Sequence, residues 1–162
     1  MFRNNLNEND ILDSRFLDKS YERAMELTEA VAAYLDMGNK NLHSASLGDS
    51  NNISYASESM RLSASLMQVM SWFLVQKGVA SGEITKEQAA EKKFRLGGKK
   101  ICLARADESR GDLPTELLSY LQQTRDLYRQ VARMDQMVYG SDDTVNPVHD
   151  LQSKIQDEDA LD

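Results

Sequence analysis

Few side chains in this sequence have the type and spacing that catalysis or ligand binding requires. The most promising pair is Glu58 and Arg61, which stand three residues apart in a stretch whose pattern predicts a helix, so both lie on one face of it. Some small all-helical enzymes line a bundle pocket with such charges, and an enzyme with a pocket near Arg61 is therefore one hypothesis. The simpler interpretation, which we favour, is a surface ion pair worth about 0.2–0.5 kcal/mol. A polar cavity holding Arg61 and two more cations would favour the enzyme, whereas a solvent-facing Arg61 would exclude it.

The other reactive side chains form no constellation. His43 falls in a predicted loop and His149 in a predicted tail, and neither has a cysteine or carboxylate four residues away on a shared helical face. Cys102 is the single cysteine, so it can form no internal disulfide. No GxSxG, Walker-type or GxGxxG motif is present, and Gly97-Gly98 alone is too short to cradle a phosphate. We therefore expect no catalytic residue, no metal and no cofactor.

Trp72 is the one large aromatic side chain on a polar strip of the same predicted helix. The other members of this polar strip are Ser54, Glu58, Arg61, Ser65, Gln68 and Gln76. The tryptophan is either covered by a loop or short helix of its own chain, which we favour, or it is an anchor for a partner. Asp135 falls on the apolar face of the last predicted helix, near its end, where we expect it to reach water.

The helix that carries these residues, predicted over Ile53–Ala80, is apolar on two further sides. A first ridge consists of Ile53, Ala56, Met60, Ala64, Met67 and Leu74. A second ridge, roughly 150° around the axis, consists of Tyr55, Leu62, Leu66, Val69 and Phe73. An outer helix of a small domain needs one apolar stripe, so this helix needs cover on most of its circumference. We expect the second ridge to hold a homodimer, with Trp72, Glu58 and Arg61 as further interaction candidates.

The elements around the central helix are also predicted to be helical. A one-sided amphipathic helix begins at Asp13 or Ser14 and ends near Gly38, and a loop follows over 39–52. After the central helix, which should end near Gly82, Thr85 and Gln88 have the spacing of a capping box and predict a short helix over 86–96.

A last long helix begins at Pro114, whose missing amide is tolerated in a first turn, and ends at Gly140. The prediction is an all-α fold, an antiparallel three-helix bundle over 13–140 with one additional short helix. Residues 1–12 are expected to form a flexible arm, and 141–162 a disordered acidic tail.

Charge and hydropathy narrow the function classes. The net charge is −7, and from residue 141 onward seven acidic residues against one lysine give −6. A nearly neutral body with an acidic tail offers no basic surface to nucleic acid, and the tail would be repelled by anionic lipid. The chain starts without an apolar run, and its longest strongly apolar stretch, 69–75, is far short of the ~20 residues that span a bilayer. We expect a cytosolic protein.

Four stretches of the sequence resemble one known family, the alphaproteobacterial regulator of CtrA degradation. The most specific is ESMRLSASLMQVMSWFLVQKGVASGEIT (58–85); the others are EKKFRL (91–96), SYERAMELTEAVAAYLD (20–36) and, more loosely, LPTELLSYLQQTRDLYRQVARMD (113–135). The resemblance extends over roughly residues 16–138, nearly the whole body. No motif in the tail or in loop 39–52 matches the family.

The resemblance implies a dimeric three-helix bundle without enzymatic activity, an adaptor for the ClpXP protease. Such an adaptor binds ClpX downstream of a single-domain response regulator and tethers substrates such as cell-cycle transcription factors. A cyclic-diguanylate-binding adaptor acts with it on the master regulator CtrA. A third reading, a helical scaffold that sequesters a partner without proteolysis, shares every feature of the sequence.

Overall fold

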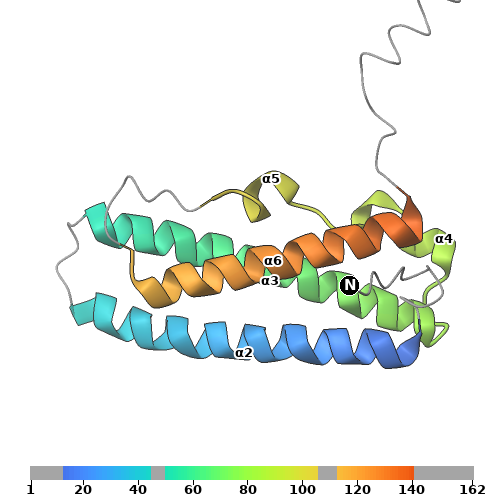
Figure 1. Ribbon diagram of the computed structural model, residues 1–162, viewed down its shortest axis with the longest axis horizontal. Helices are drawn as coiled ribbons and strands as arrows, with labels where there is room; N and C mark the ends of the chain where they lie inside the picture. The colour runs from blue at the N-terminus through green and yellow to red at the C-terminus, as the bar shows by residue number, and fades with distance from the viewer. Residues whose placement is uncertain (1–12, 45–49, 106–112, 141–162) are drawn as a thin grey trace, which may run out of the picture.

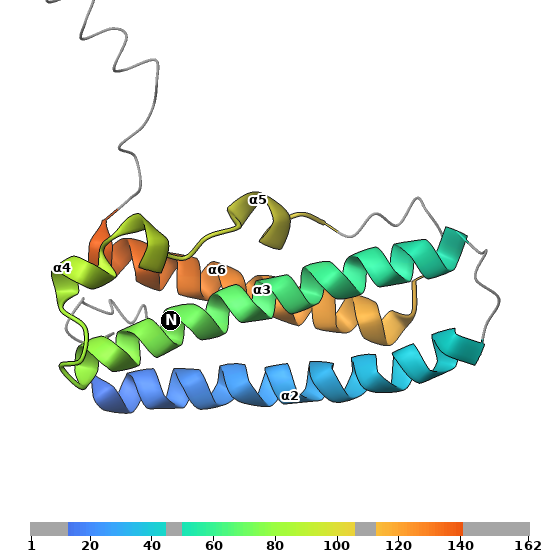
Figure 2. The same ribbon diagram turned by 180° about the vertical axis from the view of Figure 1, so that it is seen from behind.

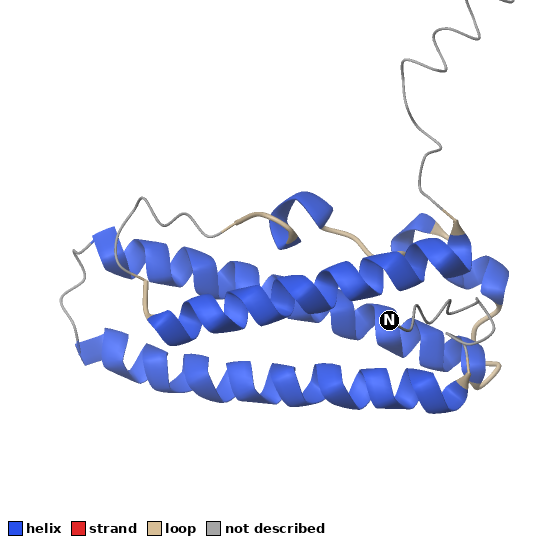
Figure 3. Ribbon diagram, viewed as in Figure 1, coloured by secondary structure: helices blue, strands red, loops and turns tan. Residues whose placement is uncertain are grey.

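The structure, a computed structural model, describes residues 13–44, 50–105 and 113–140, and three long helices make up most of them (Figure 1). They are α2 (Ser14–Ser44), α3 (Ser50–Ala80) and α6 (Thr115–Tyr139). Helix α3 packs against both of the others, and the described residues contain no strand (Figure 3). The predicted all-α three-helix bundle is confirmed. The predictions for residues 1–12, 141–162 and His149 lie outside the described residues, as does that for the side chain of His43.

The helix directions differ in part from the predicted antiparallel arrangement. Helix α2 runs against α3, since Lys77 near the end of α3 pairs with Asp18 near the start of α2 at 3.0 Å. Helices α3 and α6 run the same way, because Trp72 and Asp135, both late in their helices, share a hydrogen bond of 2.8 Å. The reason is the connection between α3 and α6, whose described part, residues 81–105, runs back along the bundle before α6 begins (Figures 1 and 2). Sequential helices joined by a short loop would pack antiparallel, but this connection is long enough to reset the direction.

The connection carries three short helical pieces on the side of the bundle away from α2 (Figure 2). They are α4 (Lys86–Ala89), the 3₁₀ helix η1 (Lys92–Phe94) and α5 (Lys99–Cys102). The capping box is confirmed, with Gln88 N donating to Thr85 Oγ1 at 3.1 Å and Thr85 N to Gln88 Oε1 at 2.9 Å. The single helix predicted over 86–96 is instead two pieces, because Glu91 and Arg95 adopt extended backbone.

The first two long helices extend further than their sequence predicted. Helix α2 continues past Gly38 to Ser44, and α3 begins at Ser50, so residues 39–44 and 50–52 of the predicted loop 39–52 are helical instead. Gly38 lies inside α2, where its lack of a side chain allows Tyr55 of α3 to pack close to the α2 backbone. A Cβ at this position would collide with the hydroxyl of Tyr55. Glycine signals at the other ends are confirmed, since α3 ends at Ala80 before Gly82 and α6 ends before Gly140, and both glycines have a positive φ.

The core lies where α2 and α6 contact the second ridge of α3. Toward the start of α2, Val69, Trp72 and Phe73 pack with Leu17 and Tyr128. Toward its other end, a second buried cluster comprises Val31, Tyr55, Leu62, Leu66 and Leu117. The two clusters together place the second ridge inside the single chain.

Candidate functional site

The eight predicted interaction residues lie largely in the interior. The apolar second ridge is between 0% and 8% exposed, and Trp72 is 1% exposed. Glu58 is buried at 9%, and the side chain of Arg61 is 14% exposed. A ridge buried within one chain has no surface to offer a second chain, so the dimer expected through Tyr55, Leu62, Leu66, Val69 and Phe73 requires a different surface.

The first ridge is the side of α3 that stays exposed. Ile53 is 73% exposed, Met60 74%, Met67 70% and Leu74 56%, and Ala56 and Ala64 between them are exposed too. The four large side chains recur every seven residues, a spacing that keeps them in one line along a helix that packs on another helix. Periodicity revealed both ridges in the sequence, but it could not say which one the chain itself covers.

Trp72 is covered by its own chain, as favoured above. Its indole Nε1 donates to Asp135 Oδ1 at 2.8 Å, and Arg95 Nε donates to both oxygens of the same carboxylate at 3.0 and 2.9 Å. Asp135 is 6% exposed, so the expectation that it reaches water is wrong. A buried carboxylate on an apolar helix face requires a cation, and Arg95 from the connection supplies it.

Arg95 holds the end of the bundle together through further contacts. Its Nη2 donates to the carbonyl oxygen of Gly140 at 2.9 Å, beyond the last residue of α6, and its guanidinium lies 5.4 Å from the ring centre of Tyr139. The hydroxyl of Tyr139 in turn donates to Gln76 Oε1 at 2.6 Å. The sequence interpretation missed Arg95; the signal that could have found it was Asp135 on an apolar face, in need of a cation.

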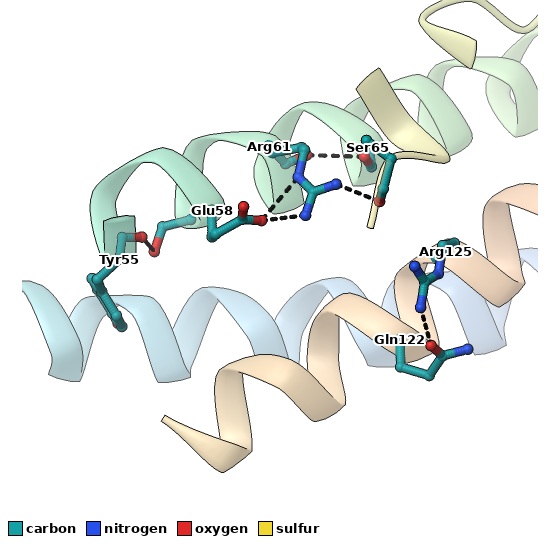
Figure 4. A network of polar contacts seen from close by, with 8 residues as sticks. Tyr55, Glu58, Arg61, Ser65, Gln122 and Arg125 are labelled. Atoms are coloured by element: carbon teal, nitrogen blue, oxygen red, sulfur yellow. Dashed lines mark hydrogen bonds and ion pairs between the residues drawn. The ribbon is translucent and has the colours of Figure 1, made fainter. Parts of the chain in front are cut away.

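Glu58 and Arg61 form the predicted pair, but not at the surface. Arg61 Nε donates to Glu58 Oε2 at 2.9 Å and Nη2 contacts the same oxygen, with side chains only 14% and 12% exposed. Arg61 Nη1 also donates to the carbonyl oxygen of Ala104, just after α5 (Figure 4). The pair therefore fastens the returning connection to α3, a larger role than that of a solvated ion pair.

Beside this pair, α3, the end of the connection and α6 enclose a pocket of about 510 Å³. Four arginines line it: Arg61, Arg105, Arg125 and Arg129. A cavity that holds Arg61 and two more cations was the observation that would favour an enzyme, and the pocket has these cations. The lining residues include no carboxylate and no histidine, and Cys102 is the only thiol among them. The arrangement can therefore bind negative charge, but the described residues that line it include no base for proton transfer.

Tyr128 closes the core behind this pocket. Burial first, and then the nearby Cys102 and Asp135, raise the pKa of Tyr128 from 10.0 to about 12. Its hydroxyl donates to the carbonyl oxygen of Gly97 at 2.6 Å, which attaches the connection to α6. The phenol is thus a neutral structural donor.

The part of the chain that the structure describes supports neither a metal site nor a membrane span. No group of three or more His, Cys, Asp or Glu side chains there could hold a metal ion. Among the same residues, no helix has the length and apolar content to cross a bilayer.

The fold and the site thus define an all-helical bundle protein that offers an exposed apolar ridge and a basic pocket. The family model described as "Protein of unknown function (DUF1465)" matches residues 8–158. The crystal structure of RcdA from Caulobacter crescentus CB15 is similar, with 36% sequence identity, a TM-score of 0.59 and coverage of 77% of this chain and 92% of that one. No curated protein matches. The chain belongs to the RcdA-like family, which confirms the resemblance to the regulator of CtrA degradation.

Proposed function

We propose that this protein is a non-enzymatic, cytosolic adaptor that tethers substrates, among them cell-cycle transcriptional regulators, to the ClpXP protease. The observation that carries the proposal is the similarity to RcdA over 92% of that chain. The lack of a base or nucleophile pair in the basic pocket favours the same conclusion, because an adaptor needs binding surfaces and no reactive centre. Its partners are ClpX, a single-domain response regulator and the substrates, with a cyclic-diguanylate-binding adaptor for some of them.

The first ridge is the surface that we assign to self-association. Two copies of α3 can pack their ridges together about a two-fold axis, since the same line of side chains is presented by both. Ala56 and Ala64 lie between the large side chains and are exposed, which permits close approach of two helices. A homodimer would then leave the outer faces of α2 and α6 free for the protease and its substrates. Because a dimer carries each binding surface twice, contacts that are weak singly bind strongly when both are made at once.

A reconstituted degradation assay tests the adaptor function. Purified ClpXP, the response regulator and a fluorescent substrate are combined with and without the full chain, and the substrate half-life is measured. We expect a shorter half-life only when all components are present. Binding of the substrate without faster degradation would instead establish the sequestering scaffold. No binding to ClpX with its response regulator, together with an unchanged substrate half-life in a deletion strain, would overturn the proposal.

A further inference from the structure

The pocket is lined by more arginines than the carboxylates that pair with them in the described residues. Arg61 is neutralised by Glu58, and Arg129 pairs with Asp126 at 3.1 Å. Arg125 donates to the neutral Gln122 (Figure 4). Within the described residues, no carboxylate pairs with Arg125 or with the exposed Arg105. In a chain whose net charge is −7, two guanidinium groups that no carboxylate of the described residues neutralises, on one hollow, mark a place for a bound anion.

Two buried polar groups of the pocket lack a partner. The hydroxyl of Thr124, a residue only 2% exposed, makes no hydrogen bond, and neither does the buried Nε of Arg125. Most buried polar atoms in folded proteins are paired, and an unpaired one destabilises the folded state. Thr124 and Arg125 both line the same cavity. Both atoms are closed to solvent, so an acceptor in the cavity would pair with them only after a shift of the two side chains.

The size and lining of the pocket indicate a small organic ligand. About 510 Å³ lies within the range of small-molecule sites, ≈ 300–1,000 Å³. Leu62, Leu118 and Leu121 line part of the wall, so an apolar body can lie beside the anionic group. A phosphate has several oxygens and close to two negative charges, which suits several guanidinium groups better than one carboxylate does.

We propose that this pocket binds a small phosphate-bearing organic molecule, with Arg105, Arg125 and Thr124 as its main contacts. Because Arg61 in the same wall donates to the Ala104 carbonyl, the ligand also fastens the end of the connection to α3 and α6. Occupancy therefore protects the amides of residues 99–105 from exchange. The inference does not depend on the adaptor function, since it concerns binding to the isolated chain.

Calorimetric titration and thermal unfolding of the full chain test the proposal, with inorganic phosphate, pyrophosphate and a nucleoside diphosphate as probes. We expect the nucleoside diphosphate to bind most tightly and to raise Tm by about 5–10 °C at a hundredfold excess over Kd. The Arg125→Gln variant should lose at least about tenfold in affinity. Its matched control is Arg133→Gln on the same helix, an exposed arginine outside this pocket, which should bind as the unchanged protein does.

The Thr124→Val variant separates a ligand contact from a structural role. Valine keeps the shape and removes a buried hydroxyl without a partner, so the unliganded variant should unfold at a higher temperature. At the same time, the rise in Tm caused by the nucleoside diphosphate should shrink. A lower Tm without ligand would show that the hydroxyl is satisfied in another way and would overturn its assignment.

Three results would overturn the proposal as a whole. The first is that no probe binds at millimolar concentration. The second is equal loss of affinity in Arg125→Gln and Arg133→Gln, which would show unspecific attraction of charge. The third is binding of a phosphorylated peptide in place of all free compounds, which would assign the pocket to a protein partner.

Discussion

At the scale of single residues, the buried carboxylate of Asp135 governs the packing of the returning connection. It accepts hydrogen bonds from Trp72 on α3 and from Arg95, so three separate stretches of chain meet at one side chain. Removing one partner of a buried ion pair leaves the other charge without compensation, which costs much more than breaking a surface pair. The bundle thus relies on a polar contact at a position where its sequence pattern calls for an apolar one.

We predict that Asp135→Ala lowers the free energy of unfolding by about 3–5 kcal/mol. Urea denaturation measures the effect. The matched control is Asp126→Ala on the same helix, whose partner Arg129 is half exposed; that change should cost less than about 1 kcal/mol. Arg95→Met in the Asp135→Ala background should restore part of the loss, because it removes the charge left unpaired. Equal costs for the two alanine variants would contradict the prediction.

Ionisation of the buried Tyr128 should lower the stability of the folded chain at alkaline pH. Its pKa is raised from 10.0 to about 12 in the folded chain, so between these values the folded state binds more protons than the unfolded state. Stability from this group is complete below about pH 10 and is lost as the pH rises toward 12. The free energy of unfolding should therefore fall between about pH 10 and about pH 12, and it should fall less steeply in Tyr128→Phe. Parallel slopes for the two proteins would refute this origin.

At the scale of the elements, local signals were sufficient for most helix ends. The capping box of Thr85 and Gln88 and the glycines at 82 and 140 act within a few residues of the chain, so their effect can be predicted from sequence. Gly38 shows the limit of such signals. Whether a glycine ends a helix or accommodates a neighbour depends on the helix that packs against it, here on Tyr55.

Gly38→Ala is therefore predicted to destabilise the bundle, although alanine in a helix interior is ordinarily more stable than glycine by about 0.5–1 kcal/mol. The added Cβ collides with the Tyr55 hydroxyl, which should cost about 1–3 kcal/mol. In a Tyr55→Phe background the hydroxyl is absent, and the same change should become neutral or stabilising. Denaturant unfolding of the four proteins of this cycle measures the coupling, and additive effects would disprove the contact.

At the scale of the whole molecule, the course of the connection over residues 81–105 determines which side of α3 stays exposed, and the sequence alone did not predict this course. The connection lies on the polar strip of α3, through contacts such as that of Arg61 with Ala104, and Arg95 joins it to Asp135 on α6. Both pairs join residues that are 40 or more positions apart, so no local pattern predicts them. With the connection on the polar strip and the outer helices on the second ridge, the first ridge is left exposed.

The exposed first ridge leads to the last prediction, on the oligomeric state. We expect the unchanged protein to have the mass of a dimer in solution, and Met60→Lys with Met67→Lys to have that of a monomer, because two charges per chain would be buried in the interface. Circular dichroism should show that the variant stays folded, since both side chains are at least 70% exposed in the single chain. The matched control is Met25→Lys with Met37→Lys on α2, also exposed, which should remain a dimer. A folded Met60/Met67 variant that keeps the dimer mass would exclude the first ridge as the interface and leave it to a substrate or to the protease.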